Sequence, residues 1–376
     1  MRILIVKLSS MGDVIHTLPV VDDLRKAAPG CVIDWVVEPA FAPLARRVKG
    51  IGEVIESPLR QWSAHWWTSA VRTEFLQFRA RLRRERYDAI LDLQGLSKSA
   101  LVAAMARGHR FAMANRTEGS GYEAPTRWVA QTKVALEPHL HALDRSRIFA
   151  SKALGYQFAG PPVFGLHVTA ARLGDGPLGG GHTVAFLHGT SRDDKLWPEE
   201  NWLALGRLLI DEGWRVALPQ GSASEGERAR RLASALGRRA AVWPSMPLGA
   251  LMDKLAGCQG AIGVDSGLSH LAVALNLPHV QIYNLPTAWR TGPLEAHGHL
   301  HQAAVLGEPT PTVAAVRSAW IAVNSAHASS GFTDDSDFQD IHADTQAMSQ
   351  ASDFADDAVT ESSGSSPQLP PAPLRR

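Results

Sequence analysis

Short apolar runs alternate with amphipathic segments along the first half of the chain. Runs rich in β-branched residues predict buried strands at Ile3–Val6, Val32–Val37, Val54–Ile55 and Ala89–Leu93. Between them, apolar residues recur at helical spacing in Leu18–Ala28 and Val71–Arg86. Strands that alternate with helices predict βαβ units and a parallel sheet.

A second series of the same kind follows the glycine-rich run RLGDGPLGGG. Its predicted strands are Thr183–Leu187, Arg215–Leu218, Gly260–Val264 and His279–Tyr283, and its predicted helices are Glu199–Glu212, Glu225–Leu236, Leu248–Gly257 and Ser269–Leu275. We therefore expect an α/β domain at 1–171, a linker at 172–181 and a second α/β domain at 182–324, whose last helix has the option of packing back on the first domain. A cleft between two such domains is a natural ligand site.

The composition changes after Asn324. Residues 331–376 hold nine acidic residues against two terminal arginines and are rich in Ser, Ala, Gln and Pro. Such a segment buries little apolar surface, so we expect a disordered acidic tail at 325–376. The tail is open to two interpretations, a docking segment or a solvated extension without a binding role.

The composition of the 376 residues excludes several classes of protein. A net charge of +1 gives no sign of a nucleic-acid partner. Cys31 and Cys258 form no motif, which favours a reducing compartment. No run approaches the roughly 18 apolar residues of a membrane span, and the N-terminus lacks the cleavage site of a signal peptide. We expect a cytoplasmic protein.

Common nucleotide and metal motifs are missing or misplaced. GDGPLG at 174–179 matches G-x-G-x-x-G, but it contains a proline and precedes a strand instead of opening a helix. There is no Walker A sequence, and the D-x-D at 335–337 lies in the acidic tail. We therefore expect no metal site and no cofactor.

The loop VDSGLSHL follows a predicted strand and opens a predicted helix. Asp265 and Ser266 are capping residues, and Gly267 permits a close approach. The amides of Ser266, Gly267 and Leu268, with His270 nearby, would suit a phosphate. The alternative is an ordinary capped helix.

Two further loops carry candidate donor contacts. In HGTSRDDKLWPEENW, the hydroxyls of Thr190 and Ser191 and the cation of Lys195 suit a diphosphate, unless the segment is only a charged surface turn. Glu225 follows another strand end, where it would hold ribose hydroxyls or merely favour the start of a helix. Met246 offers an apolar surface for a base.

The first strand leads into KLSSMGDVIHTLP, which places Asp13 at the expected cleft. Its carboxylate would take a proton from a hydroxyl that attacks a sugar. Asp13 would equally serve as a helix cap, and the two roles are compatible.

A basic and aromatic segment precedes the fourth predicted strand. Val71, Phe75, Phe78 and Leu82 form one apolar helix face. The surrounding arginines and the tryptophans thought to be exposed are Arg60, Arg72, Arg79, Arg81, Arg83, Arg84 and Arg86, with Trp62, Trp66 and Trp67. Such a surface would attract an anionic glycolipid at a membrane, or it is a solvated basic face.

Taken together, these motifs resemble the lipopolysaccharide heptosyltransferases over residues 1 to 325, and SSMGD is most similar to heptosyltransferase I. DWVVE at 34–38 and YDAILDLQGLSKSA at 87–100 contribute to the likeness. The resemblance implies the glycosyltransferase B-type fold, two Rossmann-like domains facing a central cleft. It implies inverting, metal-independent transfer of L-glycero-D-manno-heptose from ADP-heptose to a Kdo residue of Kdo-lipid A, by an enzyme peripheral to the cytoplasmic face of the inner membrane.

The resemblance also implies roles for residues. Asp13 is the expected base, and Lys195 the cation that stabilises the leaving diphosphate. Expected donor contacts are Thr190, Ser191, Lys195, Glu225, Met246, Asp265, Ser266, Gly267, Leu268 and His270. Expected acceptor contacts are Ser9, Ser10, Gly12, Arg60, Lys98 and Arg116. Two departures are Ser266, where relatives carry Thr, and Tyr122-Glu123 in place of Arg-Glu, for which Arg116 would substitute.

Three rival hypotheses stay open. The first is an ADP-heptose-dependent transferase with another acceptor, either a second core heptose or a protein. The second is a sugar-nucleotide-binding regulator, which would need no base such as Asp13. The third is a two-domain oxidoreductase, against which the missing dinucleotide fingerprint counts.

Overall fold

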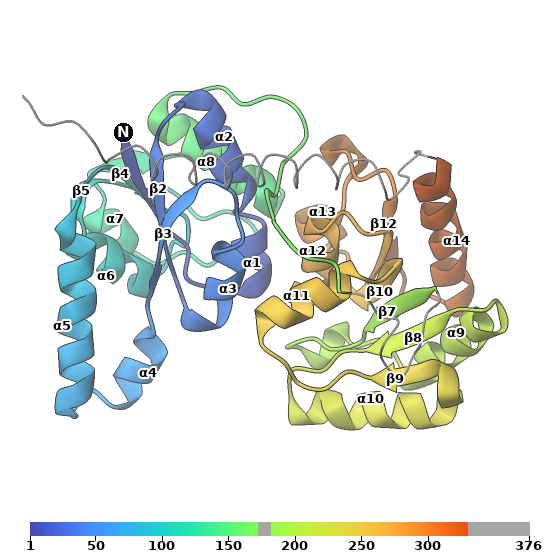
Figure 1. Ribbon diagram of the computed structural model, residues 1–376. Coiled ribbons are helices and arrows are strands. Elements are labelled where there is room, and N and C mark those ends of the chain that lie inside the picture. The colour runs from blue at the N-terminus through green and yellow to red at the C-terminus, as the bar shows by residue number, and fades with distance from the viewer. Residues whose placement is uncertain (172–181, 330–376) are drawn as a thin grey trace, which may run out of the picture. The chain divides into compact units, whose positions relative to one another are not determined.

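The two predicted α/β series form two parallel six-stranded sheets in the computed structural model (Figure 1). The structure describes residues 1–171 and 182–329, so the expected linker and all but the first five residues of the expected tail lie outside the described residues. Those five residues, 325–329, are helical.

The first sheet has the strand order β3-β2-β1-β4-β5-β6. Its strands are β1 Arg2–Val6, β2 Val32–Val37, β3 Ile51–Glu56, β4 Arg86–Asp92, β5 Arg107–Met113 and β6 Thr132–Val134. Its helices are α1 Met11–Ile15, α2 Pro19–Ala27, α3 Ala42–Ala45, α4 Leu59–Ala64, α5 Ser69–Arg84, α6 Ser97–Met105, α7 Pro125–Val129 and α8 Ala142–Leu154.

The second sheet, in the order β12-β11-β10-β7-β8-β9, repeats the topology of the first. Its strands are β7 Thr183–Leu187, β8 Arg215–Leu218, β9 Ala240–Val242, β10 Gly260–Val264, β11 His279–Tyr283 and β12 Gln302–Leu306. Its helices are α9 Glu199–Asp211, α10 Ala223–Leu236, α11 Leu248–Ala256, α12 Gly267–Ala274, α13 Ala288–Thr291 and α14 Val313–Ser329, with 3₁₀ turns η3 Asp193–Lys195 and η5 Glu295–His297.

This topology positions the site. In each sheet the first strand of the series pairs with the fourth, β1 with β4 and β7 with β10. The order of the strands reverses at that pair, because the chain adds strands on one side of it first and on the other side afterwards, and this leaves a crevice beyond the carboxyl ends of the strands. The loops that leave β1, β7 and β10 therefore share the position where ligands bind such folds.

Helices bury both faces of each sheet. One buried cluster packs α4, α5 and α6 on the first sheet, where Phe78 and Leu82 supply the predicted apolar face of α5. Another packs α9, α10 and α14 on the second sheet, so Trp320 of α14 lies in the core of its own half. No helix in the described part of the chain is long and apolar enough to cross a membrane.

Candidate functional site

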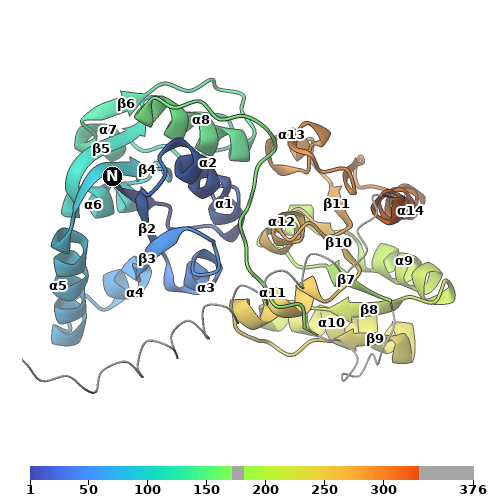
Figure 2. The same cartoon turned by 45° about the horizontal axis from the view of Figure 1, so that its top comes forward.

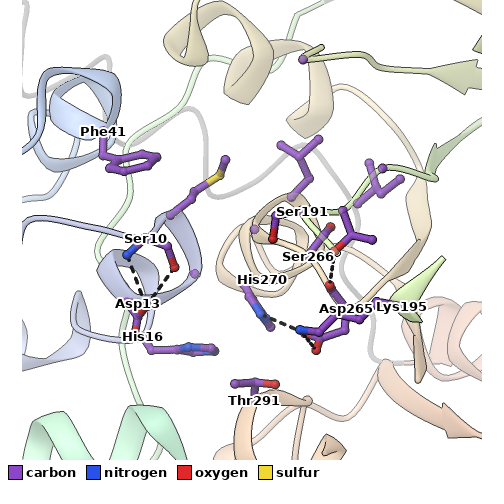
Figure 3. Close-up of a pocket in the computed structure, with 18 of the residues that line it drawn as sticks. Ser10, Asp13, His16, Phe41, Ser191, Lys195, Asp265, Ser266, His270 and Thr291 are labelled. Carbon is purple, nitrogen blue, oxygen red and sulfur yellow. Dashed lines mark hydrogen bonds and ion pairs between the residues drawn. The ribbon is translucent and has the colours of Figure 1, made fainter. Parts of the chain in front are cut away.

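A cleft of about 580 Å³ opens where the two sheets present their strand ends (Figure 3). It is lined from the first half by α1 and its approach, and from the second half by the loops after β7, β8 and β10. Figure 2 shows α1 and α12 facing each other across this region.

Two glycines let α1 and α12 touch. A methyl group on Gly12 would lie 2.6 Å from Cδ2 of His270, and one on Gly267 would lie 2.9 Å from Cβ of Met11. Real side chains do not approach so closely, so glycine at these positions sets the spacing between the two walls of the cleft. Asp13 and Asp265 are consequently held on opposite walls.

Asp13 is the carboxylate of the first wall. Ser10, the residue before α1, donates to its Oδ2 from both the backbone nitrogen (3.2 Å) and Oγ (2.9 Å). Asp13 therefore supports the start of the helix, although Ser10 and not Asp13 is the N-cap residue. The side chain keeps 38% of its surface exposed, so it remains available to a ligand.

Two buried cations hold Asp13 in its charged form. Nζ of Lys7 lies 3.4 Å and Nη2 of Arg145 lies 3.8 Å from Oδ1. Burial raises the pKa of the Asp13 carboxyl, but Lys7, the Ser10 hydrogen bonds and Arg145 outweigh it and bring the pKa to about 2. The Asp13 carboxylate is therefore ionised at neutral pH.

Asp265 is the carboxylate of the second wall, at the end of β10. Nζ of Lys195 lies 2.6 Å from its Oδ2, and Nε2 of His270 lies 3.5 Å from its Oδ1. Gln281 donates to Nδ1 of His270 (3.4 Å), which leaves the proton on Nε2, toward Asp265. Burial raises the pKa of Asp265, but His270 and Lys195 reverse this and bring it to about 2.

The start of α12 has the features expected of an anion site. Ser266 is the N-cap and accepts from the amide of Ser269. Thr190 and Ser191 line the cleft beside it, and Oγ1 of Thr190 donates to the carbonyl of Asp265 (3.1 Å). Free amides, hydroxyls and the Lys195 cation thus gather on one side of the cleft, where a diphosphate is favoured.

Glu225 lies farther along the same wall. It occupies the first turn of α10, and its Oε2 accepts from the amide of Gly221 (2.6 Å). A methyl group on Gly189 would lie 2.3 Å from Oε1 of Glu225. Because glycine has no side chain, this second carboxylate oxygen fits against the backbone of Gly189 at the edge of the cleft. An acidic side chain in that position is compatible with binding ribose hydroxyls.

A second cavity of about 270 Å³ adjoins the first and shares Asp13 and Arg145 with it. Its charged and hydroxylic lining residues are Lys7, Ser9, Ser10, Asp13, Arg60, Lys98, Ser120 and Arg145. Nζ of Lys98 donates to Oγ of Ser9 (2.7 Å) and to Glu38 (2.8 Å). Four cations and few carboxylates favour an anionic ligand in this cavity.

Most of the predicted site residues line these two cavities. Those in the cleft are Ser10, Gly12, Asp13, Thr190, Ser191, Lys195, Glu225, Asp265, Ser266, Gly267, Leu268 and His270, and those in the second cavity include Ser9, Arg60 and Lys98. Their individual roles stay predictions.

Two predicted contacts lie elsewhere. Met246 packs half-buried against the hydrophobic core and lines neither cavity, whereas Phe41 and Leu251 supply apolar surface in the cleft. Arg116 is exposed and also lines neither cavity. The hydroxyl of Tyr122, where an arginine was expected, donates to the carbonyl of Ala114 (2.9 Å).

The expectation that Trp62 is exposed was wrong. Trp62 is 4% exposed, its ring packs edge-on against Phe78, and its Nε1 donates to Glu74 (2.9 Å). Trp66 and Trp67 remain exposed, at 48% and 72% of their surface.

Sequence reasoning missed several lining residues. They are Lys7, His16, Arg145, Arg290 and Thr291. Lys7 carried a signal, because a lysine directly after four apolar strand residues is unusual unless it is paired. Arg145 lies far from Asp13 in sequence, in helix α8, which the apolar pattern did not predict, so no local pattern indicated it.

One group in the described residues has the spacing of metal ligands. Ligand atoms of His141, Asp144 and His297 lie within 4.8 Å of one another. However, the amide of Leu143 donates to Nδ1 of His141, so the proton is on Nε2, where it is donated to the carbonyl of Gly292 (3.0 Å). The nitrogen that would bind a metal is already protonated and bonded, which favours a hydrogen-bonded contact between α8 and the second half.

Known proteins share this architecture and these motifs. The model of glycosyltransferase family 9 (heptosyltransferase) matches residues 75–309. Lipopolysaccharide heptosyltransferase 1 of Escherichia coli strain K12 is 41% identical over 285 residues, which cover 75% of this chain and 88% of that protein. The chain belongs to glycosyltransferase family 9. Like that family, it is a glycosyltransferase.

Solved structures of the family agree. E. coli heptosyltransferase WaaC with ADP is 34% identical with a TM-score of 0.75, and the match covers 86% of this chain and 100% of that one. WaaC with ADP-2-deoxy-2-fluoro heptose is 35% identical with a TM-score of 0.69, covering 85% and 98%. The predicted glycosyltransferase B-type fold is thereby confirmed for this member of family 9.

Proposed function

We propose that the protein transfers L-glycero-D-manno-heptose from ADP-heptose to a Kdo residue of Kdo-lipid A. The observation that carries this proposal is the junction at Asp13. There, a donor cleft with an anion site on its far wall meets a separate cationic cavity. The similarity to heptosyltransferase 1 supports the same donor and acceptor.

The donor would lie along the second half. Its diphosphate would accept from the amides of Ser266 and Gly267 and pair with Lys195. Glu225 would accept hydroxyls of the ribose. Asp265, whose charge is paired with the Lys195 cation, would accept from hydroxyls of the sugar.

The reaction then needs one proton transfer and one displacement. An acceptor hydroxyl attacks the anomeric carbon, a new C–O bond forms, and the bond from that carbon to the phosphate oxygen breaks. Asp13 takes the hydroxyl proton, and ADP leaves with the electron pair of the broken bond. Attack from the side opposite the diphosphate inverts the anomeric configuration. Lys195 and the helix amides meet the charge of the leaving group, so we expect no requirement for a metal.

The acceptor would occupy the cationic cavity. Kdo carries a carboxylate and lipid A carries phosphates, which arginine binds through paired hydrogen bonds. Arg145 is the best placed of the four cations, since it lines both cavities and forms no hydrogen bond through its guanidinium to any other described residue. A carboxylate there would hold the acceptor hydroxyl beside Asp13.

We also propose that the protein works in the cytoplasm, at the inner membrane surface. Exposed Trp66 and Trp67 lie just before α5, near Arg72. Indole rings and arginines together favour an anionic lipid surface. Vesicles that contain anionic lipid should sediment the wild type more than a Trp66→Ala/Trp67→Ala variant, and equal sedimentation would contradict this contact.

The test of function is an acceptor assay in the presence of EDTA. ADP release from ADP-heptose should depend on Kdo-lipid A and should be unaffected by the chelator. Release only with an already heptosylated core or with a protein would identify a different acceptor. Loss of activity in EDTA with recovery in Mg²⁺ or Mn²⁺ would overturn the metal-free mechanism, and binding of ADP-heptose without transfer to any acceptor would indicate a regulator.

A further inference from the structure

His16 is a buried histidine on the floor of the cleft to which neither the motifs nor the comparisons assign a role. It directly follows α1, three residues after Asp13, and it is 6% exposed. It lines the cleft but not the cationic cavity. Figure 3 shows its ring between Asp13 and His270, with Thr291 below.

The ring of His16 is packed but not hydrogen-bonded. Its centroid lies 4.5 Å from that of His270 and 5.6 Å from that of His141. Neither ring nitrogen forms a hydrogen bond with any residue in 1–171 or 182–329, whereas His141 and His270 both have such partners. Neither nitrogen of His16 is among the fully enclosed polar atoms of the described residues, so a ligand or a water in the cleft can reach both.

The ring is also neutral. Burial, the neighbouring His270 and His141, and the cations Arg145 and Lys7 all hold the pKa of His16 well below its ordinary value. A neutral imidazole has one donor and one acceptor nitrogen. A hydroxyl, which both donates and accepts, satisfies either nitrogen. A phosphate oxygen only accepts.

We propose that His16 hydrogen-bonds a hydroxyl of the sugar that is transferred. This assignment rests on the proposed function and deepens it. The anion site and Glu225 take the diphosphate and the ribose along the second wall. The sugar must lie between that wall and Asp13. His16 lies in this part of the cleft, between Asp13 and His270 (Figure 3). His16 is then a residue that recognises the sugar, while the nucleotide is bound without it.

The test compares binding of ADP with binding of ADP-heptose, each by calorimetry without acceptor. His16→Phe keeps a ring of similar shape but has no nitrogen, and His16→Asn restores a donor and an acceptor. We expect His16→Phe to weaken ADP-heptose binding about fivefold to tenfold, as loss of one or two neutral hydrogen bonds does. ADP binding should be unchanged, and His16→Asn should recover part of the loss. His139→Phe, an exposed histidine outside both cavities, is the matched control.

Each outcome decides a separate point. Equal weakening of ADP and ADP-heptose in His16→Phe, or no weakening of either, would overturn the assignment and leave His16 as a packing residue that is satisfied by water. A lowered melting temperature with an unchanged ratio of the two dissociation constants would mean the same. If the wild type itself fails to bind ADP-heptose, the proposed function fails, independently of His16.

Discussion

Each half of the molecule holds a paired aspartate and lysine beyond the carboxyl ends of its strands, but in one pair the lysine is the more buried partner and in the other the aspartate is. In the first half, Lys7 is 3% exposed and Asp13 is 38% exposed. In the second half, Asp265 is 5% exposed and Lys195 is 18% exposed. The first pair therefore presents a negative charge to the cleft, and the second presents a positive charge.

One topology thus serves two chemical tasks, because a different partner of the ion pair is buried in each half. A buried lysine keeps Asp13 ionised, as a base must be before it accepts a proton. A buried aspartate holds Lys195 in place, and a cation that receives a diphosphate must be held in place. Four substitutions test this difference between the two halves.

Removing the exposed carboxylate should have the largest effect. We expect Asp13→Ala to lower kcat by about a hundredfold or more, because a general base contributes roughly that much. Affinity for ADP-heptose should be little changed. Steady-state kinetics and calorimetry measure both, and Asp22→Asn on α2 is the control, since that carboxylate pairs with the exposed Lys26. A near-normal kcat would reduce Asp13 to a residue that supports the start of α1.

Removing the exposed cation should come next. In Lys195→Met the carboxylate of Asp265 would face the diphosphate without its closest counter-charge. We expect kcat/KM for the donor to fall by about tenfold to a hundredfold, and ADP binding to weaken as well. Arg192→Met is the control from the same loop, because its guanidinium pairs with Asp194 at the surface. Equal effects of the two substitutions would argue against a specific role for Lys195.

The acceptor side should respond to Arg145. We expect Arg145→Met to raise the acceptor KM about tenfold through loss of a charge-assisted contact, while the donor KM changes less than about twofold. Arg147, two residues along α8, pairs with Asp23 at 2.7 and 2.8 Å and lines neither of the two cavities. Arg147→Met should therefore lower the melting temperature without changing the ratio of the two KM values. The same KM pattern in both variants would show that Arg145 acts only through folding.

The smallest effect should be a shift with pH. Lys7 is the main charge that lowers the pKa of Asp13, so Lys7→Met should raise that pKa from about 2. A carboxyl with a lowered pKa stabilises the folded state above its unfolded pKa, and this contribution is lost as pH falls toward 2. In Lys7→Met this contribution should be smaller, because the folded pKa lies closer to the unfolded pKa. The fall of kcat/KM on the acid side should therefore begin at a higher pH in Lys7→Met than in the wild type, and identical acid sides of the two pH profiles would contradict the pairing.

The sequence predicted well those parts of the fold in which local pattern and burial agree. Central strands such as β1 and β10 are continuous apolar runs, and the loops after them carry Asp, Ser and Gly. The strands β5 (RGHRFAM), β6 (TKV) and β12 (QAAVL), which lie at or near sheet edges, are partly polar or short, so their patterns gave no clear signal.

Side-chain burial and long-range pairs were harder to predict. Trp62 and Trp67 look alike in sequence, but packing against α5 buries only the first. Arg145 contacts Asp13 only because α8 packs near the loop that follows β1. His16 is recognised as part of the site only because His270 from the other half packs against it. Each of these facts depends on chain segments far apart in sequence.

The contact of α1 with α12 has a consequence for inhibition. Because Gly12 and Gly267 leave no room for even one methyl group, the distance between Asp13 and Asp265 depends on the direct contact of the two helices. A compound that inserts between α1 and α12 would move Asp13 away from Asp265 without resembling ADP or the acceptor. Such a compound should lower kcat while leaving both KM values nearly unchanged, the pattern of a pure noncompetitive inhibitor, and Gly12→Ala is the substitution that would imitate it.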